Sequence, residues 1–478
     1  MKKHNPLAIL AVFVSTEMWE RYGFYVVQSL LALFLALHFK LEEDEIYMLV
    51  GSFTALTYVS PILGGWLADH YLGQKKAILI GIVFLSVSYF MLAMATHLQA
   101  LLSALAAIAV GTGLLKPNIS ALLGKQYGKN DKQRDSGFII FYLGITVGIM
   151  LGTTVPSKLQ ENYGWAVCFL SASVGLVLAF IKFYFGSKFT AIKEQAIFKS
   201  NQWLNLLKAA VILLLTYALF FMILKTPSIA TTFFIMISLF SAGIVLKIAF
   251  NEQGKQRRNT LSLLLLFVIS IFFWAFYFQM FTTLTLFISH VVNPSLFGIH
   301  FPAPYFVAVQ STGIMVFGLI LAKILPNASN KNVAYSVAKK FTLSIACLFL
   351  SYLMIWLTIK NNLGAELISI LPLLAAYLVI SFAELMLSPI GLSAVTKLAN
   401  EKVVSTLMGV FFVSLGLGGF LSGQLAKLSA ITGKHASIIE MKGQYLQAFD
   451  CFLLILAAAF ILSCLLTKII KHLGQGPK

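Results

Sequence analysis

Apolar segments long enough to cross a lipid bilayer follow one another along the whole sequence. Six lie up to about residue 186, two more near residues 202–223 and 228–250, and six from about residue 260 to residue 471. A helix needs about 20 mainly apolar residues to cross a hydrocarbon core of about 30 Å. The short alternating segments of a membrane β-barrel are absent from this pattern. The pattern therefore predicts an all-α integral membrane protein with 14 spans.

Polar segments divide the predicted spans into three groups. GSKFTAIKEQAIFKSNQ and NEQGKQRRN flank the central pair, which predicts an N-terminal six-helix bundle over 1–186, a linker with two extra transmembrane helices over 187–259, and a C-terminal six-helix bundle over 260–478. Two six-helix halves are typical of the major facilitator superfamily fold, with a substrate site between the halves near the bilayer midplane. The inserted pair carries few polar groups beyond Lys208, Lys225 and Lys247 near the helix ends. We therefore expect the pair to be dispensable for the activity of the two six-helix bundles.

Composition and charge support a membrane protein and give its orientation. Of the 478 residues, 59% are hydrophobic and 11% are charged, whereas about a quarter of the residues of a soluble domain are charged. The formal charge of +18 is concentrated in every second connection, while the intervening HFKLEEDE is acidic. This distribution predicts cytoplasmic termini in the cell (inner) membrane, and it disfavours nucleic-acid binding. Basic residues on the predicted cytoplasmic side include Lys2, Lys3, Lys75, Lys76, Arg257, Arg258, Lys468 and Lys471.

The first predicted helix carries three charges in the stretch STEMWERYGFY. Glu17, Glu20 and Arg21 fall on one stripe of the helix, together with Phe24 and Gln28. An internal Glu17–Arg21 salt bridge is the simplest explanation, but it leaves Glu20 unexplained. A charge at the bilayer centre costs at least about 2.5–3.5 kcal/mol on insertion scales, so the stripe is expected to face a water-filled cavity. A carboxylate beside an arginine in such a cavity can act as a proton-coupled switch.

Two more charges lie within predicted spans, Lys116 in GTGLLKPNIS and Glu384 in SFAELMLSPIGLS. Each would be an unpaired buried charge if left alone, so we expect the two side chains to face each other across the cavity between the halves. Protonation of Glu384, or a substrate carboxylate at Lys116, would weaken this gating pair. A static pair that only fixes the packing is the alternative.

Three other classes of membrane protein fit the sequence less well. The histidines are scattered singly near span ends and form no HExxH pattern, which argues against a metalloenzyme and predicts no metal site. A channel of repeated subunits would need a ring of like pore-lining residues, whereas these buried charges are unique and of opposite sign. A scaffold would not need charges in the hydrocarbon layer at all.

Together these segments resemble the proton-dependent oligopeptide transporters of the major facilitator superfamily. The most specific element is the Glu-x-x-Glu-Arg motif, matched by Glu17, Glu20 and Arg21. GGWLADHYLGQKK resembles the loop between spans 2 and 3 that latches the cytoplasmic side, with Asp69 and either Lys75 or Lys76 as latching residues. LKPN, FYLGITVG, FFWAFYFQ and ELMLSPIGLS resemble the segments of spans 4, 5, 7 and 10.

The resemblance implies a symporter that imports di- and tripeptides with protons by alternating access. Arg21 and Lys116 would hold the peptide carboxylate, and Glu384 the amino group. The family needs no cofactor besides the coupling proton, and we expect a monomer whose partners are small peptides and membrane lipid. The implied substrate site comprises Arg21, Tyr25, Lys116, Tyr142, Thr146, Trp274, Gln310, Glu384 and Ser388, with proton coupling at Glu17, Glu20, Arg21 and Glu384.

Several positions depart from the family pattern, and most fall in the part that would hold the peptide. Thr146 replaces an asparagine, Phe278 replaces an acid, and Gln310 with Ser311 replaces Asn-Pro. Phe24 and Phe411 stand where a tyrosine and a tryptophan are usual. The proton machinery is therefore expected to be intact and the amino-end pocket altered. A proton-coupled transporter of a modified peptide, or of another small carboxylate, is the alternative function.

Overall fold

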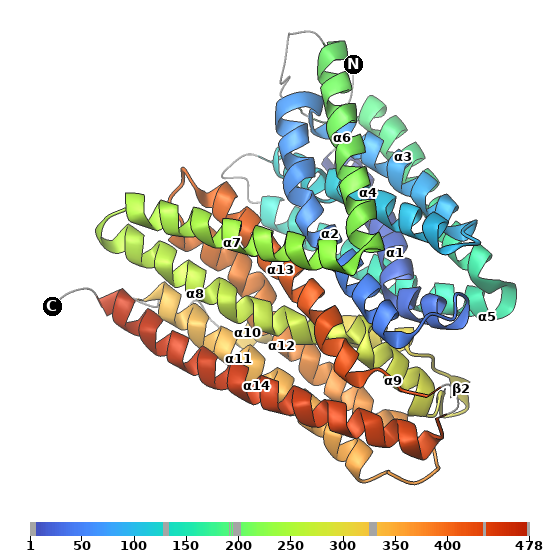
Figure 1. Ribbon diagram of the computed structural model, residues 1–478. Coiled ribbons are helices and arrows are strands. Elements are labelled where there is room, and N and C mark those ends of the chain that lie inside the picture. Colours follow the sequence, from blue (N-terminus) through green and yellow to red (C-terminus); the bar gives the residue numbers. More distant parts are fainter. Residues whose placement is uncertain are drawn as a thin grey trace. The chain divides into compact units, whose positions relative to one another are not determined.

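The computed structural model is almost entirely helical (Figure 1). It describes residues 6–127, 133–190, 192, 194, 202–324, 332–433 and 436–475, so the predicted topology signals Lys2 and Lys3 lie outside the described residues. The chain divides into two compact units. Unit 1 contains Met1–Phe39 and Leu56–Ala230, and unit 2 contains Lys40–Ala55 and Thr231–Lys478. The two units are described separately below.

Unit 1 is built from the first helices of the chain and one of the two inserted helices. Its central packing places α1 against α5, and α3 against both α4 and α5. The segment Ala68–Leu72, named η1, is a π-helix, a rare geometry that is frequent at functional sites. The elements are α1 Pro6–Leu37, α2 Glu43–Leu67, η1 Ala68–Leu72, α3 Gln74–Ala93, α4 Leu98–Gly124, α5 Gln133–Phe189 and α6 Gln202–Lys225.

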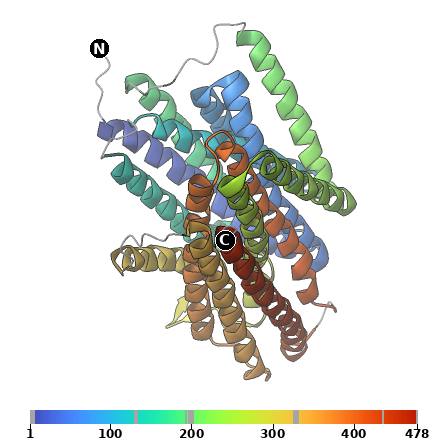
Figure 2. The same ribbon diagram turned by 90° about the vertical axis from the view of Figure 1, so that its left-hand side faces the viewer.

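Unit 2 contains the second inserted helix and the C-terminal helices. In it α11 packs on α12 and α14, α8 packs on α13, and α10 packs on α12. Figure 2 shows α11 and α14 side by side from a second direction. The elements are α7 Pro227–Asn251, α8 Gly254–Tyr277, η2 Phe278–Phe281, α9 Thr283–Val291, β1 Ser295–Leu296, β2 Ile299–His300, α10 Pro304–Ile324, α11 Val333–Lys360, α12 Ile370–Leu398, α13 Val404–Ala426, η3 Lys427–Ser429 and α14 Ile438–Gln475. The two short strands form an antiparallel hairpin.

Helix α2 belongs to both units, because the chain passes from unit 2 to unit 1 between residues 55 and 56. Its first half packs closely on α13, where a Cβ at Gly51 would lie 2.7 Å from the Cα of Gly423. Only glycine permits two helix backbones to approach so closely. This contact fixes the N-terminal end of α2, with Glu43 in its first turn, within unit 2.

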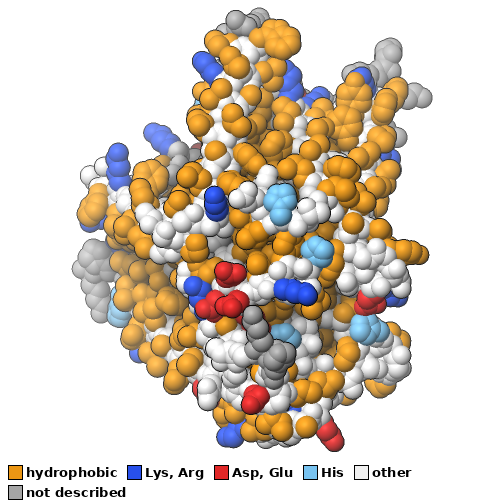
Figure 3. All heavy atoms as spheres, turned by 45° about the vertical axis from the view of Figure 1, so that its right-hand side comes forward, with side chains coloured by type: hydrophobic (Ala, Val, Ile, Leu, Met, Phe, Trp, Pro, Cys, Tyr) orange, Lys and Arg blue, Asp and Glu red, His pale blue; other side chains and the backbone are white. Residues whose placement is uncertain are grey.

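The described residues contain twelve segments that are long and apolar enough to cross a membrane. One of them, Ser136–Phe189, includes the non-helical Gly164 and is therefore two helices joined by a kink. Helix α1 is not among the twelve, although it is 32 residues long and carries Glu17, Glu20 and Arg21. Figure 3 shows a face on which hydrophobic side chains predominate. The protein is a multi-pass membrane protein, and both the count of 14 spans and the domain boundaries at residues 186 and 259 stay predictions.

Candidate functional site

Three charged side chains of α1 form a compact buried cluster, here called the acid–arginine cluster. Glu17, Glu20 and Arg21 are only 4%, 0% and 6% exposed. Arg21 Nε lies 3.1 Å from Glu17 Oε1, one helical turn away, and Arg21 also forms an ion pair and a hydrogen bond with Glu20 Oε2. Both carboxylates therefore share one guanidinium, and the predicted Glu17–Arg21 salt bridge is present together with a second one.

One oxygen of each carboxylate in the cluster is left over. Within the described part of the chain, Glu17 Oε2 and Glu20 Oε1 are buried and have no hydrogen-bond partner. A buried carboxylate oxygen without a donor is costly, and such atoms indicate a bound proton, a water molecule or a ligand. The cluster carries two negative charges against one positive charge, so one proton would neutralise it.

Close packing of α1 on α5 holds the cluster in place. A Cβ at Gly148 would lie 2.4 Å from the Met18 carbonyl oxygen and 2.8 Å from the Arg21 Cβ. Gly152 likewise lies against the backbone of Tyr22. The pair has the spacing of a small-xxx-small helix contact. The sequence analysis did not single out these glycines, although they fix the backbone that presents Arg21.

Lys116 on α4 lies over aromatic rings of the same unit. Its Nζ is 4.3 Å from the ring centroid of Tyr58 and 5.6 Å from that of Phe24. The Arg21 guanidinium lies 5.3 Å from the same Phe24 ring. An aromatic ring attracts a cation to its face, so Phe24 stabilises both cations without neutralising them. Phe24, which the sequence places on the same stripe as Arg21, is thus a residue that both Arg21 and Lys116 contact.

The carboxylate of unit 2 is surrounded by neutral partners. Gln310 on α10 donates its Nε2 hydrogen to Glu384 Oε2 at 2.7 Å, and Tyr277 on α8 also hydrogen-bonds Glu384. The Ser381 hydroxyl, one turn before Glu384, donates to the Gln310 backbone carbonyl at 2.8 Å. The side chain of Gln310 is therefore positioned at both ends. The sequence analysis included Gln310 and Glu384 in the site but did not foresee that they bond to each other.

The predicted aromatic walls differ in how accessible they are. Trp274 is buried, and its ring stacks on Phe278 and meets Tyr277 edge-on. Tyr142 is 54% exposed, whereas Tyr25 is half-buried. Thr146 is buried, and its hydroxyl donates to the Tyr142 carbonyl at 3.2 Å. Trp274 packs within unit 2, and all four residues stay predicted substrate contacts.

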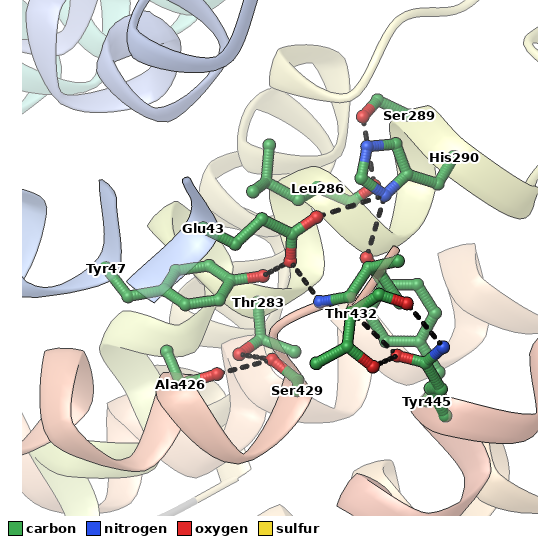
Figure 4. Close-up of polar contacts among 12 residues, drawn as sticks. Glu43, Tyr47, Thr283, Leu286, Ser289, His290, Ala426, Ser429, Thr432 and Tyr445 are labelled. Carbon is green, nitrogen blue, oxygen red and sulfur yellow. Dashed lines mark hydrogen bonds and ion pairs between the residues drawn. The ribbon is translucent and has the colours of Figure 1, made fainter. Parts of the chain in front are cut away.

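A second polar network in unit 2 was missed by the sequence analysis (Figure 4). Glu43 Oε2 accepts hydrogen bonds from the Tyr47 hydroxyl at 2.9 Å and from the Ile431 backbone N–H at 3.0 Å. Glu43 Oε1 lies 3.7 Å from His290 Nδ1, which is 3.0 Å from the Tyr445 hydroxyl. The network joins the N-terminal end of α2 to α9, to α14 and to the segment after η3. In the sequence Glu43 was recognisable only as one residue of an acidic loop, because its partners in the network are distant in sequence.

The described residues hold no group of three or more His, Cys, Asp or Glu side chains arranged to bind a metal ion. A comparison with protein families matches residues 75–442 to the model described as the POT family. The chain belongs to the POT family.

Similar proteins agree with this membership of the POT family. The chain is 31% identical to the dipeptide and tripeptide permease A of Yersinia pestis over 93% of this chain and 89% of that protein. It is 29% identical to the protein of the same name from Cronobacter turicensis over 99% of this chain and 95% of that protein. A solved structure described under substrate recognition in proton-dependent oligopeptide transporters has a TM-score of 0.83 and 25% identity, with 98% of this chain and 100% of that chain covered. The fold is that of the major facilitator superfamily, and the family is one of transporters rather than enzymes.

The predicted latching residues of this POT family chain lie around η1 and are not equivalent. Asp69 and Lys76 are exposed. Lys75 instead contacts a distant segment, because its Nζ donates to the Ile192 carbonyl at 2.8 Å. Lys116 belongs to unit 1, whereas Glu384 and the half-buried Ser388 belong to unit 2. The expected Lys116–Glu384 pair therefore stays a prediction.

Proposed function

We propose that this protein is a proton-coupled symporter that imports di- and tripeptides by alternating access. The observation that carries the proposal is the acid–arginine cluster, in which Glu17 and Glu20 share Arg21 while each keeps one oxygen without a donor. A proton taken up by the cluster removes one negative charge and weakens the hold on Arg21. Arg21 is then available to a substrate carboxylate. Proton uptake and substrate binding are thereby coupled through one guanidinium.

The proposed substrate class follows from the charges at the two clusters. Arg21 and Lys116 supply cationic groups for a carboxylate, and Glu384 supplies an anionic group for an amino terminus. A zwitterion of variable side chain is best recognised by its constant charged ends. Relatives named dipeptide and tripeptide permease support peptides as the substrates. Tyr25, Tyr142 and Thr146 are the proposed contacts to the variable part of the peptide.

Two further features belong to the same proposal. The alternation of basic and acidic connections supports cytoplasmic termini and a place in the inner membrane. We also expect a monomer, and we expect protons to be the only coupling ion.

Uptake of labelled dialanine into liposomes carrying the purified protein tests the function. We expect accumulation that depends on an inward proton gradient and that is lost in Glu20→Gln. Exposed Glu401 provides a matched control, and Glu401→Gln should accumulate dialanine like the original protein. No gradient-dependent uptake by well-folded protein would contradict the proposal for ordinary peptides.

The alternative substrate class, a modified peptide or another small carboxylate, is favoured by the state of the amino-end pocket. Gln310 is already bonded to Glu384, and the family's acid at position 278 is a phenylalanine that stacks on Trp274. Inhibition of substrate uptake by two unlabelled competitors distinguishes the two substrate classes. Dialanine and N-acetyl-dialanine carry the same carboxylate but differ in the amino charge. Equal inhibition by both would favour the alternative, and inhibition by dialanine alone would favour ordinary peptides.

A further inference from the structure

Helix α3 begins without a capping side chain of its own. Its N-cap residue is Gly73, which has a φ of 79° and contributes no side-chain hydrogen bond. The first N–H groups of a helix have no partner within the helix and need an acceptor from elsewhere. This helix start follows η1 directly, within the loop that resembles the cytoplasmic latch. The group that accepts hydrogen bonds from these N–H groups therefore affects the conformation of this loop.

The acceptor is a carboxylate from the segment that follows α5. Glu194 Oε1 accepts a hydrogen bond from the Lys75 backbone N–H at 2.9 Å. In the opposite direction, the Lys75 Nζ donates to the Ile192 carbonyl at 2.8 Å. A Cβ added to Gly73 would lie 3.1 Å from Glu194 Oε1, so a larger residue would crowd the carboxylate. The contact is reciprocal and ties the start of α3 to residues more than a hundred positions later.

The inserted helix α6 continues this contact along unit 1. Ala209 is 1% exposed and lies in one apolar cluster with Leu67, Ala68, Leu72, Ala77 and Leu114, which come from the end of α2, from η1, and from α3 and α4. Towards the other end of α6, Tyr217 and Ser103 of α4 share a hydrogen bond at 2.6 Å. Figure 1 shows α6 alongside α4 within this unit. Thus α6 packs on the π-helix η1 through Ala209 and is also held to α4 by the Tyr217–Ser103 hydrogen bond.

We propose that Ile192, Glu194 and α6 form a clamp on η1 and the start of α3, so that the inserted helix controls how readily this loop changes conformation. A π-helix is a rare geometry that occurs mostly as a single turn at functional sites, so the contacts that hold η1 bear on how this loop moves. The contacts of the clamp need no ligand. The clamp gives the inserted helix α6 a role in the conformation of this loop. From the sequence alone we expected the two inserted helices to be dispensable.

Cysteine labelling tests the clamp without relying on transport. Gln74 is buried in the first turn of α3. Gln74→Cys would be introduced into protein whose cysteines at 168, 347, 451 and 464 are replaced by serine, and reacted with a maleimide in detergent. We expect Glu194→Ala to raise the labelling rate several-fold and Glu194→Gln, which keeps an acceptor oxygen, to raise it less. Glu401→Ala is the matched control and should leave the rate unchanged.

A second variant approaches the clamp from α6. Ala209→Leu overfills the apolar cluster and should also raise labelling of Gln74→Cys, whereas Leu215→Trp changes a side chain of α6 that is 65% exposed and should not. Thermal unfolding followed in parallel separates local release from global destabilisation. Equal labelling of all variants with unchanged unfolding temperature would overturn the clamp. Such a result leaves the proposed transport function untouched, because no substrate is used.

The effect on the cycle, which rests on the proposed function, is measured separately. If the clamp holds one conformation, Glu194→Ala should change the maximal rate of proton-driven uptake and leave the half-saturating substrate concentration unchanged. A change confined to the half-saturating concentration would place Glu194 with the substrate contacts and contradict the clamp.

Discussion

The two units of this protein accommodate buried charge in different ways. In unit 1, Glu17 and Glu20 share Arg21, and Lys116 adds a further cation over Phe24. In unit 2, two charges, those of Glu384 and Lys442, have neutral hydrogen-bond partners. Glu384 accepts from Gln310 and Tyr277, and Lys442 donates to the backbone carbonyls of Asn362, Gly364 and Glu366.

This difference indicates which charged groups can gain or lose a proton. An ion pair with spare carboxylate oxygens can take up a proton without losing all its contacts, and its net charge then changes. A charge held by amide and hydroxyl groups has partners that do not change charge themselves. Unit 1 is therefore suited to proton transfer, whereas the neutral partners in unit 2 are suited to holding a fixed charge or to signalling its loss.

The largest effect is expected from Glu20→Gln, which removes one charge from the shared pair. Gradient-driven uptake should fall at least ~10-fold, equivalent to about 1.4 kcal/mol in the rate-limiting barrier. Counterflow of substrate without a gradient should persist, because Glu17 still pairs with Arg21. Retention of full gradient-driven uptake would show that unit 1 does not carry the proton, and the comparison would fail.

A loss of similar size is expected from Glu384→Gln, and a smaller one when only the neutral partner of Glu384 in unit 2 is altered. Glu384→Gln removes the charge and should abolish gradient-driven uptake while leaving counterflow measurable. Gln310→Leu keeps the carboxylate and removes one donor, so its loss of uptake should be smaller than that of Glu384→Gln. If Gln310→Leu is the more damaging change, then Gln310 contacts substrate directly instead of acting through Glu384.

The position of the acid–arginine cluster can be disturbed from α5. Gly148→Leu places atoms where the Met18 carbonyl and the Arg21 Cβ already lie. Overpacking of this kind costs about 1–3 kcal/mol, measured as a lower unfolding temperature. Gly243→Leu on the exposed face of α7, where a Cβ meets nothing within 4 Å, is the control. Equal stability of the two variants would mean that α1 can move away from α5 without loss.

Lys442 shows how much neutral partners contribute to a cation. Lys442→Met leaves three carbonyl groups of the α11–α12 connection without their donor, and a hydrogen bond to a charged group is worth about 1.5–3 kcal/mol. We expect a lower unfolding temperature than for Lys468→Met, an exposed lysine on the same helix. No difference between the two would indicate that the carbonyl groups find other donors at no cost.

The smallest effect is expected in the Glu43 network. Glu43→Gln loses the carboxylate charge that lies 3.7 Å from His290 Nδ1, a contact that is an ion pair only when His290 is protonated, but keeps an oxygen that can accept from Tyr47 and Ile431. Partly exposed ion pairs contribute about 0–1 kcal/mol, so the free energy of unfolding should change by less than ~1 kcal/mol. Glu45→Gln, which changes an exposed side chain of the same helix, is the control. A larger loss would show that the network, like the acid–arginine cluster, depends on charge.

The sequence predicted those parts of the molecule that depend on local pattern. The apolar segments give the helices, and the spacing of Glu17, Glu20 and Arg21 places them on one stripe. Features made by distant partners were not predictable in this way. Glu194 capping α3, Gln310 bonding Glu384 and Glu43 meeting Ile431 each join residues whose proximity only the folded chain reveals. The π-helix at Ala68–Leu72 has no apolar period of its own to indicate it.

The division of the chain also determines what holds its two units together covalently. The backbone crosses between the units at residues 39–40, 55–56 and 230–231. The first two crossings lie close together in sequence, and the third lies near the turn between α6 and α7. A single proteolytic cut at that turn would divide the chain into two fragments, and the N-terminal fragment would keep the first half of α2, which packs within unit 2 through contacts such as Gly51 against Gly423. The protein should therefore survive as a nicked molecule, and two separately expressed chains divided at that turn are candidates for functional reassembly.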